Sequence, residues 1–228
     1  SVVATDANDQ PLNIQFSNTY TRAEGTGEID GEKILTGRNL IDGEFTFVLN
    51  GTGLATAPSA HNAADGSFTV QLPTYRYDPA IDDDDKDADV IYLTATEQTF
   101  NYTLVEDTSA LPAGVTHSFP AQSFPVKVVV TYTLGNGSLS VVATDANDQP
   151  LNIQFSNSFT VDVTFSKVAA GQTEELEGAT LTVRDENGNV VESWESDGSV
   201  KVLQLTAGEY TMIEDQAPLG YDVAETIT

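Results

Sequence analysis

Apolar and polar residues alternate along most of this chain with a period of two, the spacing of a β-strand that buries one face. Thr, Val, Tyr and Phe dominate these segments, as strands prefer, and apolar repeats with a helical period are absent. Seven segments before residue 158 are predicted as strands: 44–49, 67–72, 90–95, 99–106, 124–134, 138–144 and 151–157. Four more follow, at 161–168, 179–185, 199–205 and 209–215.

Turn residues separate these strands. Clusters of Gly, Asn, Asp and Pro lie between them, and DENGN (185–189) and TAGEY (206–210) are typical of tight turns. Many short strands with no helix between them favour β-sandwiches. We therefore expect an all-β protein built from two tandem immunoglobulin-like sandwiches.

One long repeat bears on the domain boundaries. Residues 1–18 recur without change at 140–157, a separation close to the length of one domain. We expect residues 1–19 to be the closing strand of a preceding repeat, or a copy added artificially. The two domains then span 20–159 and 160–228, and the second is expected to lack its own last strand.

Three strands of the first domain each place one reactive group at the end of an apolar face. The groups are the amine of Lys33, the carboxyl of Glu106 and the carboxamide of Asn157. Residues of like parity share a face of a strand. Their apolar partners are Ile29 and Leu35, then Tyr102 and Leu104, then Leu151, Ile153 and Phe155. The second domain repeats two of the three groups, with Lys167 after Phe165 and Glu214 after Met212.

This pattern predicts a covalent cross-link. An ionised lysine in an apolar core is costly, because burial favours the neutral forms of both amines and carboxyls. A neutral amine is a competent nucleophile, and a protonated carboxyl can polarise an amide carbonyl. We expect Lys33 to attack Asn157, releasing ammonia and leaving an isopeptide bond. Glu106 would polarise the carbonyl and carry the protons, once per molecule and without turnover.

Two other residues compete for these roles. Lys127 is a second possible amine, but its parity opposes that of the neighbouring valines, so we expect it to face solvent. A strand-end lysine can also extend its amine to water. Asn18 has the same sequence context as Asn157, and we favour Asn157 because it closes the same domain as Lys33.

The composition excludes several function classes. A net charge of −26 argues against nucleic-acid binding, which needs a basic surface. Such a charge fits a solvated extracellular surface. No stretch approaches the roughly 18 apolar residues of a membrane-spanning helix. The chain has no cysteine, so an extracellular fold must be held by core burial or by another covalent tie.

Metal binding and turnover chemistry have little support. The acidic run IDDDDKDADV (81–90) lacks the glycine and the terminal glutamate of an EF-hand loop, so we expect a solvated loop. His61 and His117 are the two histidines, and no G-x-S-x-G motif is present. We expect no metal, no cofactor and no enzyme activity beyond the single intramolecular reaction.

Ordered sequence blocks resemble two known families. GEKILTGRNLIDGEFTFVLNG, ADGSFTVQLPTYRY, FNYTLVED, GVTHSFPAQSFPVKVVVTY and IQFSNSF are similar, in order, to the isopeptide-linkage domains of Gram-positive pilins. VTFSKV, LEGATLTVRDENGNVV and LTAGEYTMIEDQAPLGYDVAETIT resemble a collagen-adhesin B-type (Cna B-like) domain. The resemblance implies a first-strand lysine, a glutamate in the YTxxE block and a last-strand asparagine. In the first domain these residues are Lys33, Glu106 and Asn157. In the second domain they are Lys167 and Glu214, and the strand that would carry the asparagine is absent.

The resemblance implies a mechanical role. We expect a stalk or shaft segment of a Gram-positive surface pilus or adhesin, displayed on the cell wall or pilus. Its partners would be adjacent domains or pilin subunits of the same surface protein. The alternative is an adhesin module that binds a host protein or glycan through exposed aromatic residues, for which Tyr75 and Tyr77 are the candidates.

Overall fold

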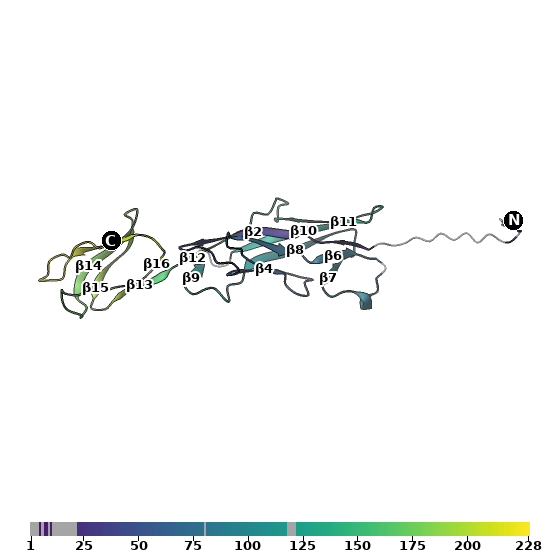
Figure 1. Cartoon of the computed structure of the whole chain (residues 1–228). Coiled ribbons are helices and arrows are strands. Elements are labelled where there is room, and N and C mark those ends of the chain that lie inside the picture. Colours follow the sequence, from purple (N-terminus) through teal and green to yellow (C-terminus); the bar gives the residue numbers. More distant parts are fainter. Residues whose placement is uncertain (1–4, 6, 9, 11–21, 80, 118–121) are drawn as a thin grey trace.

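The computed structural model describes residues 5, 7–8, 10, 22–79, 81–117 and 122–228 (Figure 1). Most of the first copy of the repeat, with the expected strand at 1–19 and Asn18, lies outside the described residues. Within the described part, one short 3-10 turn, η1 (Asp83–Asp85), is the only helical element, and no helix could span a membrane. The chain is therefore nearly all β, as the alternation predicts.

Twelve strands are described in the first domain. They are β1 (Ala23–Gly25), β2 (Glu28–Thr36), β3 (Thr46–Gly51), β4 (Ser59–His61), β5 (Ser67–Gln71), β6 (Thr74–Tyr77), β7 (Val90–Tyr92), β8 (Glu97–Glu106), β9 (Val115–His117), β10 (Ser123–Thr133), β11 (Ser138–Thr144) and β12 (Gln154–Phe159). One sheet has the order β5-β2-β12-β9 and the other β11-β10-β8-β3-β4. A third, small sheet has the order β1-β6-β7.

The two large sheets enclose one apolar core. Buried side chains from both sheets form a single cluster, as expected for a sandwich. Three buried phenylalanine rings, Phe47, Phe68 and Phe155, belong to this cluster, and the half-buried Phe124 packs against it. Phe155 contacts the other three, with ring centroids 4.9–6.1 Å away. The core therefore surrounds β12, the last strand of this domain.

The first long strand and the last strand of this domain are neighbours. β12 pairs with β2 in parallel, and Phe155 lies opposite Lys33 while Asn157 lies opposite Leu35. Parallel neighbours cannot be joined by a hairpin, so the rest of the domain lies between them in the sequence. This pairing brings residues more than a hundred positions apart onto one face of one sheet.

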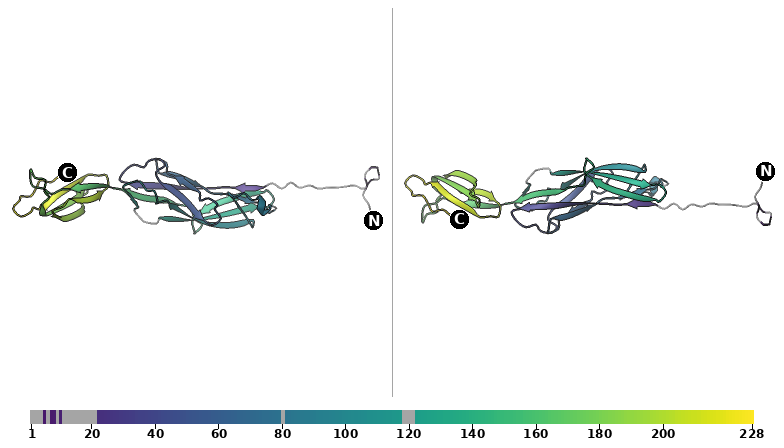
Figure 2. Two further views of the ribbon diagram at one scale, coloured as in Figure 1. Left: turned by 90° about the horizontal axis from the view of Figure 1, so that it is seen from below. Right: turned by 90° about the horizontal axis from the view of Figure 1, so that it is seen from above.

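The second domain is a smaller sandwich. Its strands are β13 (Val161–Phe165), β14 (Glu177–Asp185), β15 (Val190–Asp197), β16 (Lys201–Leu205) and β17 (Tyr210–Gln216). They form sheets of order β13-β16 and β15-β14-β17. The DENGN turn joins β14 to β15 as predicted, through hydrogen bonds between Asp185 and Asn189. Thr160 alone separates β12 from β13, and the two domains follow one another along the molecule (Figure 2).

All eleven predicted segments contain a strand. The largest differences are three residues at one end: β12 begins only at Gln154, β7 ends at Tyr92 and β13 ends at Phe165. Strands β1, β4, β6, β9 and β15 lie outside the predicted segments. The sequence pattern missed β15 because this strand alternates mostly between exposed and half-exposed residues, with one buried serine, so its apolar signal is weak. Trp194 lies on β15 and packs edge-on against Phe165 at 5.8 Å between ring centroids.

Candidate functional site

Lys33, Glu106 and Asn157 meet inside the first domain. Lys33 comes from β2 and Asn157 from the adjacent strand β12, while Glu106 ends β8 in the opposite sheet. Each is at the end of an apolar run whose other members face the same core. The structure thus brings together the three residues that the alternation singled out.

The carboxyl of Glu106 bridges the amine and the amide. Its Oε1 lies 2.6 Å from Nζ of Lys33, and its Oε2 accepts a hydrogen bond from Nδ2 of Asn157 at 2.9 Å. Oδ1 of Asn157 is buried and accepts no hydrogen bond from the residues that the structure describes. The amine and the amide are therefore held by opposite oxygens of one carboxyl.

The amide orientation differs from the expectation. The sequence argument predicts a hydrogen bond from Glu106 to the amide carbonyl, whereas the carboxyl accepts one from the amide nitrogen. A carboxylate is an acceptor only, so it faces the NH₂ group. In this orientation Glu106 is next to the nitrogen that would depart as ammonia, which suits a proton carrier.

The site is dry. Lys33 is 1% exposed, Glu106 7% and Asn157 0%, and the ring of Phe45 lies 4.3 Å from Nζ of Lys33. Burial lowers the pKa of Lys33 below its ordinary value, although Glu106 and Glu44 act to raise this pKa. The lowered pKa favours the neutral amine, the form that can attack a carbonyl carbon.

Two family models match the chain in tandem. A model of the FctA family, described as a Spy0128-like isopeptide-containing domain, matches residues 29–160, more than half of the chain. The chain belongs to this FctA family. A second model, the SpaA prealbumin-like fold domain, matches residues 161–228, so the two matches adjoin at the end of β12. The FctA match includes Lys33, Glu106 and Asn157.

Solved structures of two pilins and of one further protein are similar at low identity. The shaft pilin SpaA from Lactobacillus rhamnosus GG is 15% identical with a TM-score of 0.32, covering 89% of this chain and 92% of its own. The major pilin from Streptococcus pyogenes is 15% identical with a TM-score of 0.33, covering 83% and 82%. The Bacillus anthracis TIE protein is 16% identical with a TM-score of 0.36, and the match covers 88% of this chain but 30% of that one. No curated protein matches the chain.

The second domain holds a similar amine and carboxyl. Nζ of Lys167 lies 3.1 Å from Oε1 of Glu214, and the backbone N–H of Ala224 donates to Oε2 at 2.6 Å. A cavity of about 180 Å³ lies beside the pair, and no asparagine is among its described lining residues. Backbone hydrogen bonds pair Met212 with Ile227 next to it. The backbone N–H of Ala224 thus donates to the carboxyl of Glu214, as the side-chain amide of Asn157 donates to the carboxyl of Glu106 in the first domain.

The rival residues lie elsewhere. Lys127 is on the solvent side of β10, where its Nζ pairs with Asp148 at 2.7 Å, as its parity predicted. The aromatic candidates for host binding were wrong in part, because Tyr75 is fully buried and donates a hydrogen bond to Tyr102. Tyr77 is half-buried and stacks on Tyr132. Among the described residues, no group of three metal-ligating side chains is placed to hold an ion.

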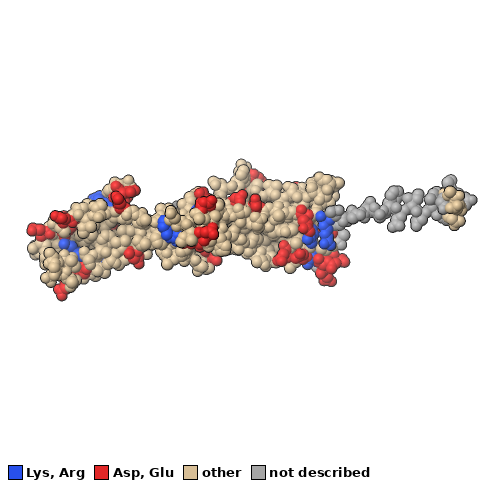
Figure 3. Space-filling model, in the orientation of Figure 1, with Lys and Arg blue, Asp and Glu red and all other residues tan. Residues whose placement is uncertain are grey.

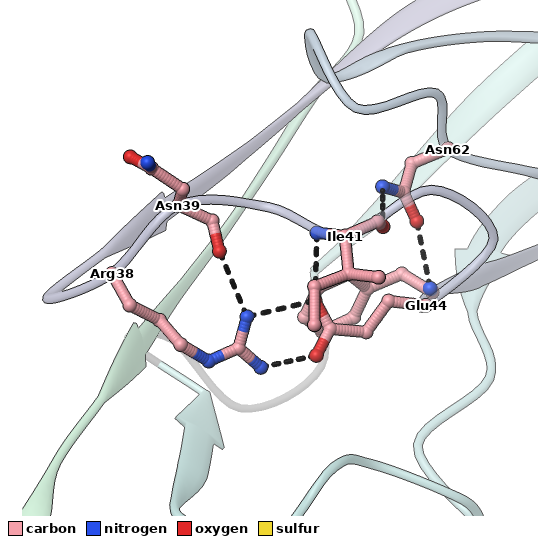
Figure 4. Close-up of polar contacts among 6 residues, drawn as sticks. Arg38, Asn39, Ile41, Glu44 and Asn62 are labelled. Atoms are coloured by element: carbon pink, nitrogen blue, oxygen red, sulfur yellow. Dashed lines mark hydrogen bonds and ion pairs between the residues drawn. The ribbon is translucent and has the colours of Figure 1, made fainter.

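Sequence reasoning missed one feature beside the site, the loop between β2 and β3. Arg38 and Glu44 form a bidentate ion pair there, and the side chain of Asn62 forms hydrogen bonds with the backbone of the loop (Figure 4). Oδ1 of Asn62 accepts from the backbone N–H of Phe45, and Nδ2 donates to the carbonyl of Ile41. Apolar and polar residues do not alternate regularly in the segment GRNLIDGEF, so the sequence pattern does not indicate the contacts that its side chains make.

Proposed function

We propose that the first domain joins Lys33 to Asn157 through an isopeptide bond that it forms by itself. The observation that carries this proposal is the buried carboxyl of Glu106, which contacts both the amine and the amide. Membership of a family of isopeptide-containing domains supports it. No external catalyst is needed, because burial supplies the neutral amine.

The reaction is a transamidation. Nζ of Lys33 attacks Cγ of Asn157, a new C–N bond forms, and the bond from Cγ to Nδ2 breaks. Glu106 takes a proton from the attacking amine and delivers it to the departing nitrogen, which leaves as ammonia. The carboxyl ends as it began, and the chain is lighter by one ammonia.

We further propose that the chain is a load-bearing segment of a Gram-positive surface pilus or adhesin. Its partners would be neighbouring domains or subunits of the same fibre, and its place the cell wall or pilus. Membership of the FctA family and the adjoining SpaA-type match support this role. The buried position of Tyr75 removes one of the two candidates for the alternative, direct host binding through exposed aromatics.

The second domain is proposed to carry a related pair. Lys167 and Glu214 would be the amine and the carboxyl of a second cross-link, whose carboxamide is not among the residues that line the cavity. We place the boundary between the domains at Thr160, between β12 and β13.

Intact-mass spectrometry tests the cross-link. The wild-type chain should be lighter than its sequence mass by one ammonia, and a digest should contain a branched peptide joining Lys33 to Asn157. Glu106→Ala should restore the full mass and lower thermal stability, by analogy with a disulfide that contributes up to about 4–5 kcal/mol. Glu44→Gln, a change at a neighbouring carboxyl, is the matched control and should still lose ammonia. An unmodified wild-type mass would end the proposal.

A further inference from the structure

The ring of Phe45 covers the reactive amine. Its centroid lies 4.3 Å from Nζ of Lys33, and the two residues are 2% and 1% exposed. Phe45 itself lies in the loop between β2 and β3, because β3 begins only at Thr46. Its buried backbone N–H is therefore outside the hydrogen-bond ladder of the strand and needs a partner from elsewhere.

Asn62 provides that partner. Its Oδ1 accepts a hydrogen bond from the backbone N–H of Phe45 at 2.7 Å, and its Nδ2 donates to the carbonyl of Ile41 at 2.9 Å (Figure 4). Nδ2 also donates to the carbonyl of Ala63 at 3.0 Å. Asn62 is 2% exposed, so these bonds form away from water, and a carboxamide can satisfy both kinds of backbone group. Asn62 thus fixes the backbone that carries the ring of Phe45.

The turn that begins with Asn62 also holds the strand of the amine. Asn62 follows β4, and Gly66 directly precedes β5. The carbonyl of Gly66 accepts a hydrogen bond from the backbone N–H of Lys33 at 2.7 Å, and the N–H of Gly66 donates to the carbonyl of Ala63 at 3.0 Å. One short turn therefore contacts Phe45 through Asn62 and Lys33 through Gly66, and so sets the position of the ring relative to the amine.

We propose that Asn62 is a positioning residue for the cross-linking reaction: it keeps the ring of Phe45 over the amine of Lys33 and so keeps water away from the amine. This inference rests on the proposed cross-link. An amine that is shielded from water loses the hydration that stabilises its charged form, so the neutral nucleophile is favoured. An aromatic face also attracts an ammonium ion, but this attraction is weaker than the hydration that the ring displaces.

The pH profile of the reaction measures this protection. The full chain is isolated unfolded in denaturant and refolded by dilution at several pH values, and the loss of ammonia is followed by mass spectrometry. Phe45→Ala should admit water and move the profile to higher pH. At neutral pH it should slow the reaction, about tenfold for each unit that the pKa of Lys33 rises. Phe45→Leu, which keeps an apolar cover, should move the profile less.

Asn62→Ala should move the profile in the same direction as Phe45→Ala, because the ring is no longer held over the amine. The double variant, Asn62→Ala with Phe45→Ala, should have the profile of Phe45→Ala, since no ring is left for Asn62 to position. Val130→Ala is the control for lost stability, because Val130 is buried and lies opposite Gln98, at the other end of β8 from Glu106. It should destabilise the domain and leave the pH profile in place.

Each outcome bears on one proposal. An Asn62→Ala chain that is less stable but keeps the wild-type profile overturns the positioning role, because Asn62 would then serve the fold alone. A double variant whose profile lies beyond that of Phe45→Ala also overturns it, because the two residues would act separately.

Two further results are read in the same series. If Asn62→Ala does not fold, Asn62→Ser is measured in its place, because a hydroxyl can still accept a hydrogen bond. If neither variant folds, Phe45→Ala decides, and an unmoved profile overturns the proposal. A wild-type chain that never loses ammonia contradicts the cross-link itself, and is read before any variant.

Discussion

At the residue scale, the first domain depends on an amine in a place where an amine is unfavourable. Lys33 is among the largest fully buried side chains of the described residues, beside phenylalanines and a tyrosine. Its amine contacts one carboxyl and the face of an aromatic ring, and its side chain has no solvent-exposed surface. A permanent amide would remove this titrating group from the core altogether, so the reaction and the fold favour the same end state.

Stability should depend on pH when the amine is kept. Asn157→Ala removes the acceptor and leaves Lys33 free. Because burial lowers its folded pKa from 10.5, the unfolded chain binds more protons between the two values. The free energy of unfolding should therefore rise with pH across that window and level off above it.

The control for this experiment lacks the amine. Lys33→Met combined with Asn157→Ala should not show that rise in urea denaturation measured over the same pH series. Parallel pH profiles for the single and double variants would mean that Lys33 is protonated equally in the folded and unfolded chains.

At the scale of elements, the site depends on how tightly the β4–β5 turn closes over β2. The carbonyl of Gly66 accepts from the backbone N–H of Lys33 at 2.7 Å. Gly66 has a φ of +93°, and a Cβ there would lie 2.4 Å from the backbone oxygen of Lys33. A glycine is needed for both the conformation and the close approach.

Gly66→Ala should therefore destabilise the fold by more than the cost of placing an alanine in the left-handed conformation. Gly53 is the matched control, because its φ is +84° and a Cβ at this residue would have no neighbour within 4 Å. Gly53→Ala should cost about 1–2 kcal/mol from the left-handed backbone. Gly66→Ala should cost a further ~1–3 kcal/mol from the overlap, measured by urea unfolding. Equal costs at the two positions would show that the turn can move away from β2.

At the scale of the whole molecule, the parallel pair β2 and β12 defines a path for force. If the proposed bond forms, tension that enters ahead of β2 and leaves through Thr160 passes from Lys33 to Asn157 and bypasses the strands between them. Acidic side chains are spread over both domains, and few basic ones accompany them (Figure 3). Such a surface repels other surfaces of the same charge.

Pulling the full chain by its ends should reveal the bypass. With the cross-link, the first domain should not extend by its full length, whereas Glu106→Ala should release on the order of 400 Å at about 3.3–3.6 Å per residue. Single-molecule force spectroscopy measures this step, and unfolding of the second domain serves as an internal reference. A wild-type chain that releases the same length would contradict a covalent tie between β2 and β12.

The alternation of apolar and polar residues determined the all-β class and which residues face the core. It picked out Lys33, Glu106 and Asn157, because the face of a strand residue follows from parity alone. Parity does not say which strands are neighbours. The parallel register of β2 and β12, and the arrival of Glu106 from the opposite sheet, follow from pairing across the whole sandwich.

Only the tertiary structure decided the remaining details. The burial of Tyr75, the orientation of the Asn157 amide and the Arg38–Glu44 pair all depend on contacts between segments distant in sequence or on irregular backbone. Local patterns carry no information about such contacts, since loop residues have no periodicity and a side chain's partner is set by the packing around it. The sequence thus indicated Lys33, Glu106 and Asn157 as candidates, and the tertiary structure determined their burial and their contacts.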